Sequence, residues 1–181
     1  RERENYMTPE EAFLHALRYG PLEETREIVC KSSNYAYGYA REIDKCPRED
    51  TRKAACKSSY NAYKYAENID KEPRKDTRNA ACKDPYYAYL YAKNIDECSR
   101  EDTLKAACED SEFAYLYALY IHKKPRNNTR KAACEDPEFA YFYTLNVDKS
   151  FHEDTWKAVK NTEFEEKYNK FLNQIEKSKI I

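Results

Sequence analysis

A 26-residue pattern repeats five times without a gap between Thr25 and Asp154. The copies approximate T-R-x-A-A-C-x-(D/S)-x-x-x-A-Y-x-Y-A-x-x-I-D-x-x-P-R-x-D and begin at Thr25, Thr51, Thr77, Thr103 and Thr129. A strict period of this length is typical of solenoids, in which each repeat packs mainly against its neighbours. The period therefore predicts a stack of similar units and favours a function in binding other macromolecules.

Each repeat carries the signals of two short helices. Pro73 suits the first turn of a helix, and the segment that follows it to Lys83 is rich in alanine. Asp84 and Pro85 form a helix-start signature, an N-cap carboxylate followed by proline. From Pro85 to about Asp96, apolar residues fall on one helical face, at Ala88, Tyr91, Ala92 and Ile95. We therefore expect an all-α fold, an α-α superhelix (solenoid) of 26-residue two-helix repeats.

The ends of the chain depart from the consensus, as capping repeats of a solenoid do. Residues 1–24 form the expected N-terminal cap, a lone second helix that starts near Thr8. Residues 155–181 form the expected C-terminal cap, a degraded first helix followed by a longer polar helix. Between them the five repeats span 25–50, 51–76, 77–102, 103–128 and 129–154.

The composition restricts the possible partners. Charged residues make up 36% of the chain, yet the net charge is -1, so no bulk attraction draws it to nucleic acid or an anionic membrane. No apolar run approaches the roughly 20 residues that span a bilayer, and no apolar core of a signal peptide is visible. We therefore expect a cytoplasmic protein with no membrane partner.

Seven cysteines are predicted to remain free thiols. Five share one slot of the repeat, and equivalent atoms of stacked helices lie about 8–10 Å apart, beyond the roughly 7 Å limit for a disulfide. No C-x-x-C spacing occurs and the chain has 3 histidines, so no metal site is expected. Because the phosphate-loop, H-E-x-x-H and G-x-S-x-G motifs are also missing, the sequence predicts a protein that is not an enzyme and needs no cofactor.

Rows of tyrosine and of charge recur with the repeat. An inward row, predicted to fill the seams between repeats, comprises Tyr39, Tyr65, Tyr91, Tyr117 and Tyr143. A flank row admits either the same packing or a stacking surface for bases or a partner, and comprises Tyr37, Tyr63, Tyr89, Tyr115 and Tyr141. Arginine and aspartate rows are expected to form exposed ion pairs from one turn to the next, each worth about 0–1 kcal/mol.

The basic rows also allow a second hypothesis, a surface that binds nucleic acid or a nucleotide through its phosphates. Its candidate residues are Arg52, Lys53, Arg78, Lys105, Arg130 and Lys131. Carboxylates lie between these side chains and would repel the same phosphates, so this hypothesis is less favoured.

The places where the repeats disagree give the strongest functional signal. Counting each Thr as position 1, positions 14, 17 and 18 should lie outside the core face of the second helix. They are polar or small in the first two repeats and become apolar later, at Leu90, Leu116, Leu119, Tyr120, Phe142 and Leu145. Large apolar patches rarely stay exposed. These six residues are therefore predicted to bind another protein, to pair two copies as a C2 homodimer, or to lie beneath the C-terminal helix.

Repeat four is chemically distinct. Leu104 replaces the arginine, His122 replaces the aspartate, and Asn127 and Asn128 replace an acidic pair. Because Lys123, Lys124 and Arg126 remain without those carboxylates, the turn is locally basic. It is either a specificity element beside the apolar residues or a repeat that has drifted.

The run from Asp84 to Ala92 and the run from Asp136 to Tyr141 resemble helical-repeat proteins that are common in bacteriophage genomes and carry D-P-E-x-A-Y-x-Y-A-x-x-V. The repeat layout is also similar to that of leucine-rich-variant repeats. The resemblance covers Thr25 to Asp154 and supplies no catalytic residue. It implies a phage-encoded adaptor in the cytoplasm of a bacterial host cell that binds a host or phage protein, with occlusion of a bacterial defence protein as one such role. A self-assembling structural protein is a further alternative.

Overall fold

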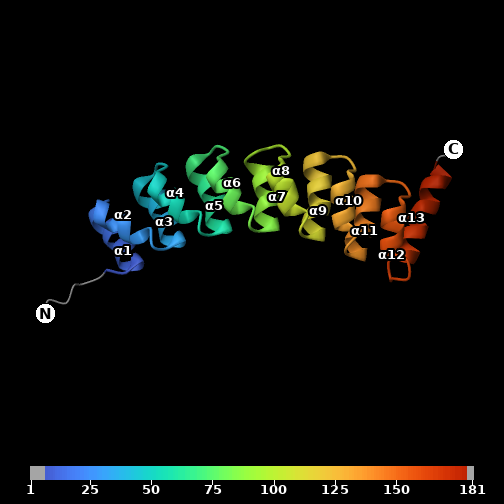
Figure 1. The fold of residues 1–181 in the computed structure, drawn as a ribbon, viewed down its shortest axis with the longest axis horizontal. Coiled ribbons are helices and arrows are strands. Elements are labelled where there is room, and N and C mark those ends of the chain that lie inside the picture. The colour runs from blue at the N-terminus through green and yellow to red at the C-terminus, as the bar shows by residue number, and fades with distance from the viewer. Residues whose placement is uncertain (1–6, 179–181) are drawn as a thin grey trace. The chain divides into compact units, whose positions relative to one another are not determined.

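The computed structural model describes residues 7–178, and within that range the chain forms helices and turns and no strand. The first helix of each pair, helix A, recurs at the repeat period as α2 (Glu23–Val29), α4 (Glu49–Ala55), α6 (Lys75–Ala81), α8 (Glu101–Ala107), α10 (Asn127–Ala133) and α12 (Glu153–Val159). The second, helix B, recurs as α1 (Pro9–Tyr19), α3 (Ser33–Tyr39), α5 (Ser59–Tyr65), α7 (Pro85–Asn94), α9 (Ser111–Tyr117), α11 (Pro137–Tyr143) and α13 (Glu165–Ser178). The predicted all-α architecture of two-helix repeats is confirmed (Figure 1).

Most B helices end in a π-helical turn that an α-helical wheel does not anticipate. These turns are η1 (Ala40–Asp44), η2 (Ala66–Asp70), η3 (Ala118–His122) and η4 (Thr144–Asp148). In η2 the amide of Lys71 donates to the carbonyl of Ala66 at 2.9 Å, which closes the wider ring. The residue after each turn has a left-handed backbone, with φ of 53–55° at Lys45, Lys71, Lys123 and Lys149. Left-handed φ ends the helix and sends the chain back toward the next helix A.

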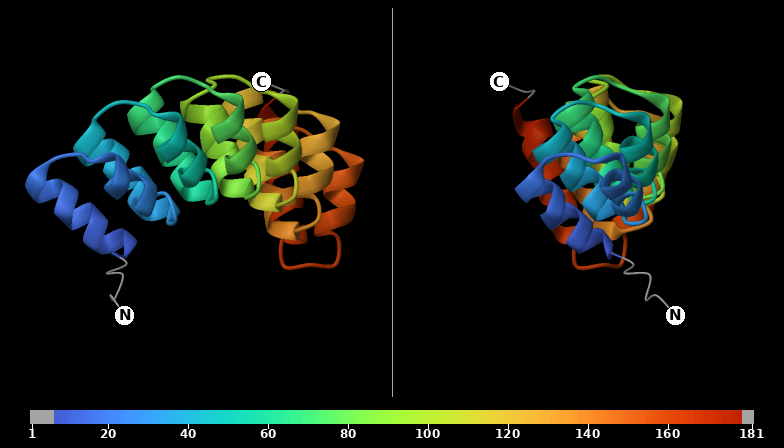
Figure 2. Two further views of the ribbon diagram at one scale, coloured as in Figure 1. Left: turned by 60° about the vertical axis from the view of Figure 1, so that its left-hand side comes forward. Right: turned by 90° about the vertical axis from the view of Figure 1, so that its left-hand side faces the viewer.

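The chain divides into two compact units, Arg1–Asp96 and Glu97–Ile181. The boundary falls within the third repeat, directly after its helix B. Within the first unit, α3 packs on α4 and α5 packs on α6; within the second, α9 packs on α10 and α11 packs on α12. The left-hand view of Figure 2 shows neighbouring helices side by side within each unit.

The inward tyrosine row fills the core, as predicted, and it also caps helix A. Tyr65 is fully buried. Its hydroxyl accepts from the amide of Arg48 at 3.0 Å and lies 2.9 Å from the Thr51 hydroxyl. Arg48 is the N-cap residue of α4 and offers no side-chain cap of its own. The tyrosine of helix B therefore satisfies the start of helix A in the same repeat, where backbone amides otherwise lack partners.

The flank tyrosine row is also largely buried, so it packs the seams between repeats. Tyr37, Tyr63, Tyr89 and Tyr115 are each at most 9% exposed. The amide group of Asn68 donates to the Tyr37 hydroxyl at 3.0 Å, and Asn146 bonds Tyr115 in the same way at 2.9 Å. These bonds join consecutive repeats within a unit. They leave little of the row available as a stacking platform for bases.

The arginine and aspartate rows differ from the expectation in both location and burial. Arg52 on α4 forms hydrogen bonds to Asp70 at the end of the same repeat, with Nη2 to Oδ1 at 2.5 Å. Their side chains are only 9% and 1% exposed. The expected exposed pairs between turns are thus wrong for this row: the pairs are buried and lie within one repeat. The reason is the short repeat, which brings positions 2 and 20 together at one end of the helix pair.

Candidate protein-binding surface

Five of the six predicted contact residues lie in the second unit. Leu116 belongs to α9, Leu119 and Tyr120 to η3, Phe142 to α11 and Leu145 to η4. We call these five residues the apolar patch. Tyr120 has 49% of its surface exposed, whereas the other four are half-buried. The patch is therefore a partly embedded surface with one prominent aromatic side chain.

Half-burial of the patch has a structural cause. Leu116, Leu119 and Phe142 pack against the core cluster of Tyr115, Ala118, Ala133 and Tyr143. The Phe142 ring lies 6.1 Å from the Tyr115 ring and 5.7 Å from the Tyr141 ring. The prediction that position 14 lies away from the core is wrong for this residue. At position 14, Phe142 contacts the flank tyrosine of the preceding repeat. This side chain therefore packs two repeats together.

Leu90, the sixth predicted residue, belongs to the first unit. It is half-buried on α7 and packs against Tyr63, Ala66, Ala81 and Tyr91. Like Phe142, it occupies position 14 and contacts a flank tyrosine. Its neighbours at positions 17 and 18 are Lys93 and Asn94, both exposed. Leu90 is therefore better explained as seam packing than as part of a binding surface.

The C-terminal helix serves as the last helix B. Tyr168 on α13 is fully buried, and its hydroxyl lies 2.9 Å from the Thr155 hydroxyl, the same contact that the inward tyrosines make. The cluster around it includes Tyr141, Trp156, Phe164 and Leu172. Within the described part of the chain, none of the five patch residues belongs to that cluster. Coverage of the patch by this helix, one of the three readings of the sequence, therefore has no support from this cluster.

Three of the six nucleic-acid candidates have their guanidinium groups in buried ion pairs. Arg52 bonds Asp70, Arg78 bonds Asp96 and Arg130 bonds Asp148, the last two at 3.1 and 2.7 Å. Hydrogen bonding to Asp148 raises the pKa of Arg130, against an opposing effect of burial. The remaining candidates, Lys53, Lys105 and Lys131, are exposed. An accessible arginine row for phosphates is therefore not present at these three positions.

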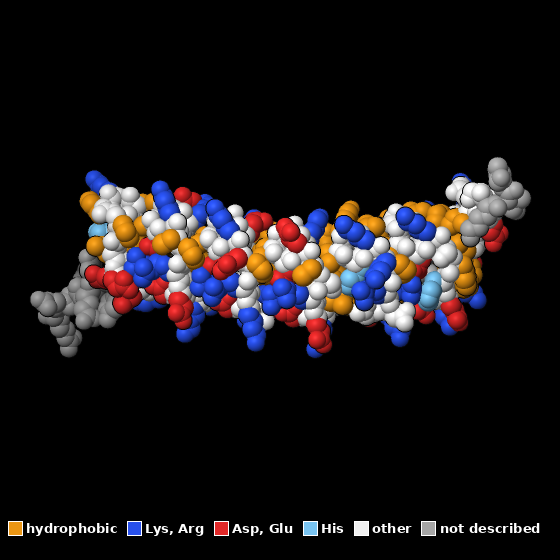
Figure 3. All heavy atoms as spheres, turned by 90° about the horizontal axis from the view of Figure 1, so that it is seen from above, with side chains coloured by type: hydrophobic (Ala, Val, Ile, Leu, Met, Phe, Trp, Pro, Cys, Tyr) orange, Lys and Arg blue, Asp and Glu red, His pale blue; other side chains and the backbone are white. Residues whose placement is uncertain are grey.

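Charge on the face with the turns from helix B to helix A is mixed in the first unit, as Figure 3 shows. One hollow there is lined by Glu72, Pro73, Arg74, Lys75, Asp76 and Asn79. Arg74 pairs with Glu72 and Asp76 at 3.6 and 3.5 Å. Because its arginine is matched by two carboxylates, this hollow offers a phosphate little net attraction.

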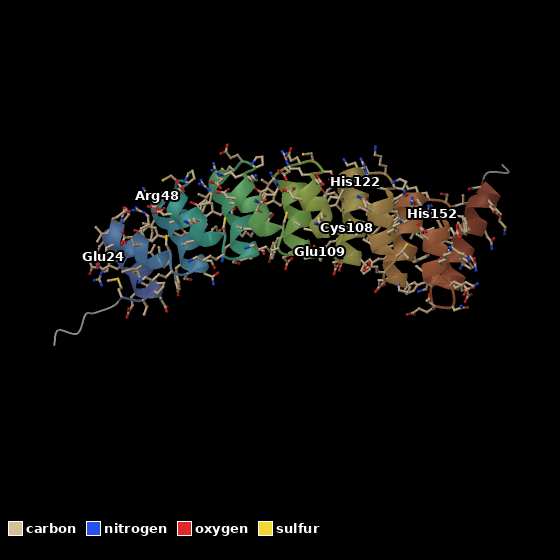
Figure 4. The ribbon with its side chains drawn as sticks, viewed as in Figure 1. Glu24, Arg48, Cys108, Glu109, His122 and His152 are labelled. Atoms are coloured by element: carbon tan, nitrogen blue, oxygen red, sulfur yellow. The ribbon has the colours of Figure 1, made fainter. Side chains whose placement is uncertain are left out.

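Repeat four replaces both members of the buried ion pair at once. Leu104 occupies the arginine position and His122 the aspartate position. His122 Nε2 lies 3.0 Å from the Ser99 hydroxyl, and its ring lies 5.1 Å from the Tyr117 ring (Figure 4). Burial, together with the positive charges of Arg126 and Lys124, lowers the pKa of His122 to about 4. Leu104 and His122 together thus replace a charged pair with an apolar side chain and a neutral one. In the sequence alone these two substitutions were read as separate changes.

The cysteines offer no reactive site on helix A. Burial raises the pKa of Cys56 and Cys108 to about 11 and that of Cys134 to about 12, so these thiols stay protonated. All seven cysteines are free, and Cys46 and Cys98 are the exposed members. No group of His, Cys, Asp and Glu within residues 7–178 could hold a metal ion. In the same range no helix has the length and apolarity to cross a bilayer.

No protein-family model matches the chain, and neither a curated protein nor a solved structure does. The class that the fold defines is that of two-helix repeat solenoids. Within that class, the residues of this chain alone indicate its function.

Proposed function

We propose that the chain is a non-enzymatic scaffold that binds another protein through the apolar patch. The observation that carries this proposal is Tyr120, an aromatic side chain 49% exposed that shares helix α9 and its π-helical turn η3 with half-buried Leu116 and Leu119. The same positions 17 and 18 hold Arg41 and Glu42 in the first repeat. Tyrosine is one of the residue types enriched at interface hot spots, where a few side chains carry most of the binding energy.

The resemblance to phage-encoded repeat proteins supports a partner class, a host or phage protein within a bacterial cell. Occlusion of a bacterial defence protein is the role that this resemblance favours for a chain without catalytic motifs. Binding of nucleic acid has less support, because Arg52, Arg78 and Arg130 are committed to buried aspartates. Catalysis has no support from the motifs of the sequence.

The test compares proteins retained from bacterial lysate by the tagged chain and by two variants. Tyr120→Ala removes the patch centre, and Phe151→Ala is the matched control, since Phe151 is a 56% exposed aromatic of the same unit outside the patch. Nuclease and high salt remove contacts that depend on nucleic acid or on screened charge. A protein retained by the original chain and by Phe151→Ala, but lost with Tyr120→Ala, supports the proposal. Loss in both variants, or in neither, contradicts the patch assignment.

A further inference from the structure

The short turns that join helix A to helix B carry opposite charges in the two units. In the first unit, position 7 of each repeat is an exposed lysine: Lys31, Lys57 and Lys83. In the second unit, positions 7 and 10 are exposed glutamates: Glu109, Glu112, Glu135 and Glu138. We call these two rows the basic edge and the acidic edge. The near-zero net charge of the chain conceals this separation.

Contacts between successive turns build the basic edge into a continuous surface. Lys57 Nζ donates to the carbonyl of Cys30 at 3.2 Å, one repeat earlier. Tyr60 and Tyr86 are 45% and 42% exposed, and both rings contact Tyr87, at 5.8 and 5.0 Å between centroids. The lysines are thus interleaved with tyrosines that present aromatic surface to solvent.

The acidic edge has the complementary composition. Asp110 and Asp136 accept hydrogen bonds from backbone amides at the starts of α9 and α11, so they serve as N-caps. The four glutamates stay exposed, and half-buried Phe113 and Phe139 lie next to them in the chain. Glu109 lies on the opposite edge of its unit from His122 and His152 in Figure 4. The acidic edge is therefore well separated from the basic turn of repeat four.

The two edges share one frame. Lysines recur at the repeat period in the first unit, and glutamates recur at the same period in the second, at the same turn of the helix pair. Rows built on the same repeat present their charges at similar intervals. An alignment that pairs one lysine with a glutamate therefore also pairs the next lysine with the next glutamate. Complementary rows of this kind fix partner and register more than they add affinity, while aromatic contact supplies the apolar area.

We infer that the chain associates with a second copy of itself, the basic edge of one copy docking against the acidic edge of the other. This contact is distinct from the apolar patch and does not rest on the proposed function. It does not involve Tyr120. Because surface charge pairs are screened by salt, the association weakens as ionic strength rises.

The test uses two charge-reversed chains whose mass in solution is measured by light scattering at low salt. One carries Lys31→Glu, Lys57→Glu and Lys83→Glu, and the other carries Glu109→Lys, Glu135→Lys and Glu138→Lys. The original chain is expected to associate, and each reversed chain alone is expected to be monomeric. An equimolar mixture of the two restores the mass of the pair, since acidic edges then face basic edges again.

A matched pair of variants controls for bulk attraction between oppositely charged proteins. It carries the same charge changes on other exposed positions, Lys53→Glu, Lys105→Glu and Lys131→Glu in one chain and Glu27→Lys, Glu49→Lys and Glu101→Lys in the other. These two chains should each associate as the original does. The inference is overturned if the original chain is monomeric at low salt, if a reversed-edge chain still associates alone, or if the control chains lose association. A basic edge that binds an acidic peptide or single-stranded DNA while the chain stays monomeric is a contradiction too.

Discussion

At the scale of single residues, one hydroxyl per repeat links packing to helix formation. Helix A has seven residues, too few to stand alone in water. The inward tyrosine supplies both the apolar ring that fills the seam and the oxygen that satisfies the N-cap amide. Six buried tyrosines repeat this contact, from Tyr39 with Thr25 to Tyr168 with Thr155. A polar atom, in addition to the ring, is therefore needed at this core position.

Removing that oxygen alone should be costly. Tyr65→Phe keeps the ring but leaves the amide of Arg48 without its partner, and it removes one of the two contacts of the Thr51 hydroxyl, which keeps its bond to the Arg48 carbonyl. We expect the free energy of unfolding to fall by about 1–3 kcal/mol, as measured by urea denaturation. Tyr60→Phe is the control, because its exposed side chain should change stability by less than about 0.5 kcal/mol. Equal stability of the two variants would contradict the capping role.

The left-handed residue after each π-helical turn stores strain. Lys71 has φ 55°, a region that costs an L side chain about 1–2 kcal/mol and glycine almost nothing. Lys71→Gly should therefore raise the free energy of unfolding by about 0.5–1 kcal/mol after the entropy of the unfolded chain is allowed for. Lys53→Gly, in the interior of α4, should instead lower it by about 1 kcal/mol. A loss in both variants would show that the lysine side chain itself stabilises the turn.

Titration of His122 should appear in the stability of the second unit. Its folded pKa is about 4, below the ordinary value of 6.5, so the folded state favours the neutral ring. The stabilising contribution is fully present above about pH 6.5 and is lost as pH falls toward 4, because the unfolded chain binds the proton first. Thermal unfolding of His122→Gln should lose this segment of the pH dependence, whereas His152→Gln should keep it. The same pH profile in all three chains would exclude the assignment.

At the scale of elements, much of each helix pair could be predicted from the sequence. Pro85 and the preceding Asp84 correctly marked the start of α7, and the Ala-rich segment after Pro73 marked α6 within a residue or two. Burial of the inward tyrosine row could be predicted from the 3.6-residue spacing of apolar residues along helix B. Local signals sufficed here because each helix starts at a cap and buries one face.

Other features depended on contacts that no local pattern encodes. The π-helical turns change the direction of positions 17 and 18 relative to an α-helical wheel, so the degree of exposure at Leu119 and Tyr120 could not be read from spacing. Burial of Arg52 with Asp70 follows from the meeting of two helix ends 18 residues apart. The sequence carried one signal of the joint replacement at Leu104 and His122: the same repeat lacks both the arginine and the aspartate of the pair.

The arginine–aspartate pair that repeat four lacks should be restored without loss of stability only when both positions are changed together. Leu104→Arg alone places a charge beside His122, and His122→Asp alone buries a carboxylate without its arginine. Each should lower the free energy of unfolding, since a buried charge without a partner is costly. The double variant recreates the pair of Arg52 and Asp70, so its stability should exceed the sum of the single effects by roughly 1–3 kcal/mol. Additive effects in urea denaturation would show that the two positions do not interact.

At the scale of the whole molecule, a constant frame carries surfaces that change along the chain. Positions that face the core, such as Tyr65, Ala62 and Thr51, recur in nearly every repeat. Outer positions vary, and in the second unit they form the apolar patch and the acidic edge. Repeat proteins commonly gain a binding specificity this way, since a surface change on one repeat leaves its neighbours' packing intact.

The central claim is that Tyr120 contacts another protein, and site-specific photocrosslinking tests it most directly. A photoreactive phenylalanine analogue would replace Tyr120 in one chain and Phe151 in another, and both would be irradiated in bacterial cells. We predict a discrete crosslinked product from position 120, joined to a protein other than this chain, with none from position 151. Labelling only of the chain's own copies at position 120, or equal labelling from both positions, would contradict the claim.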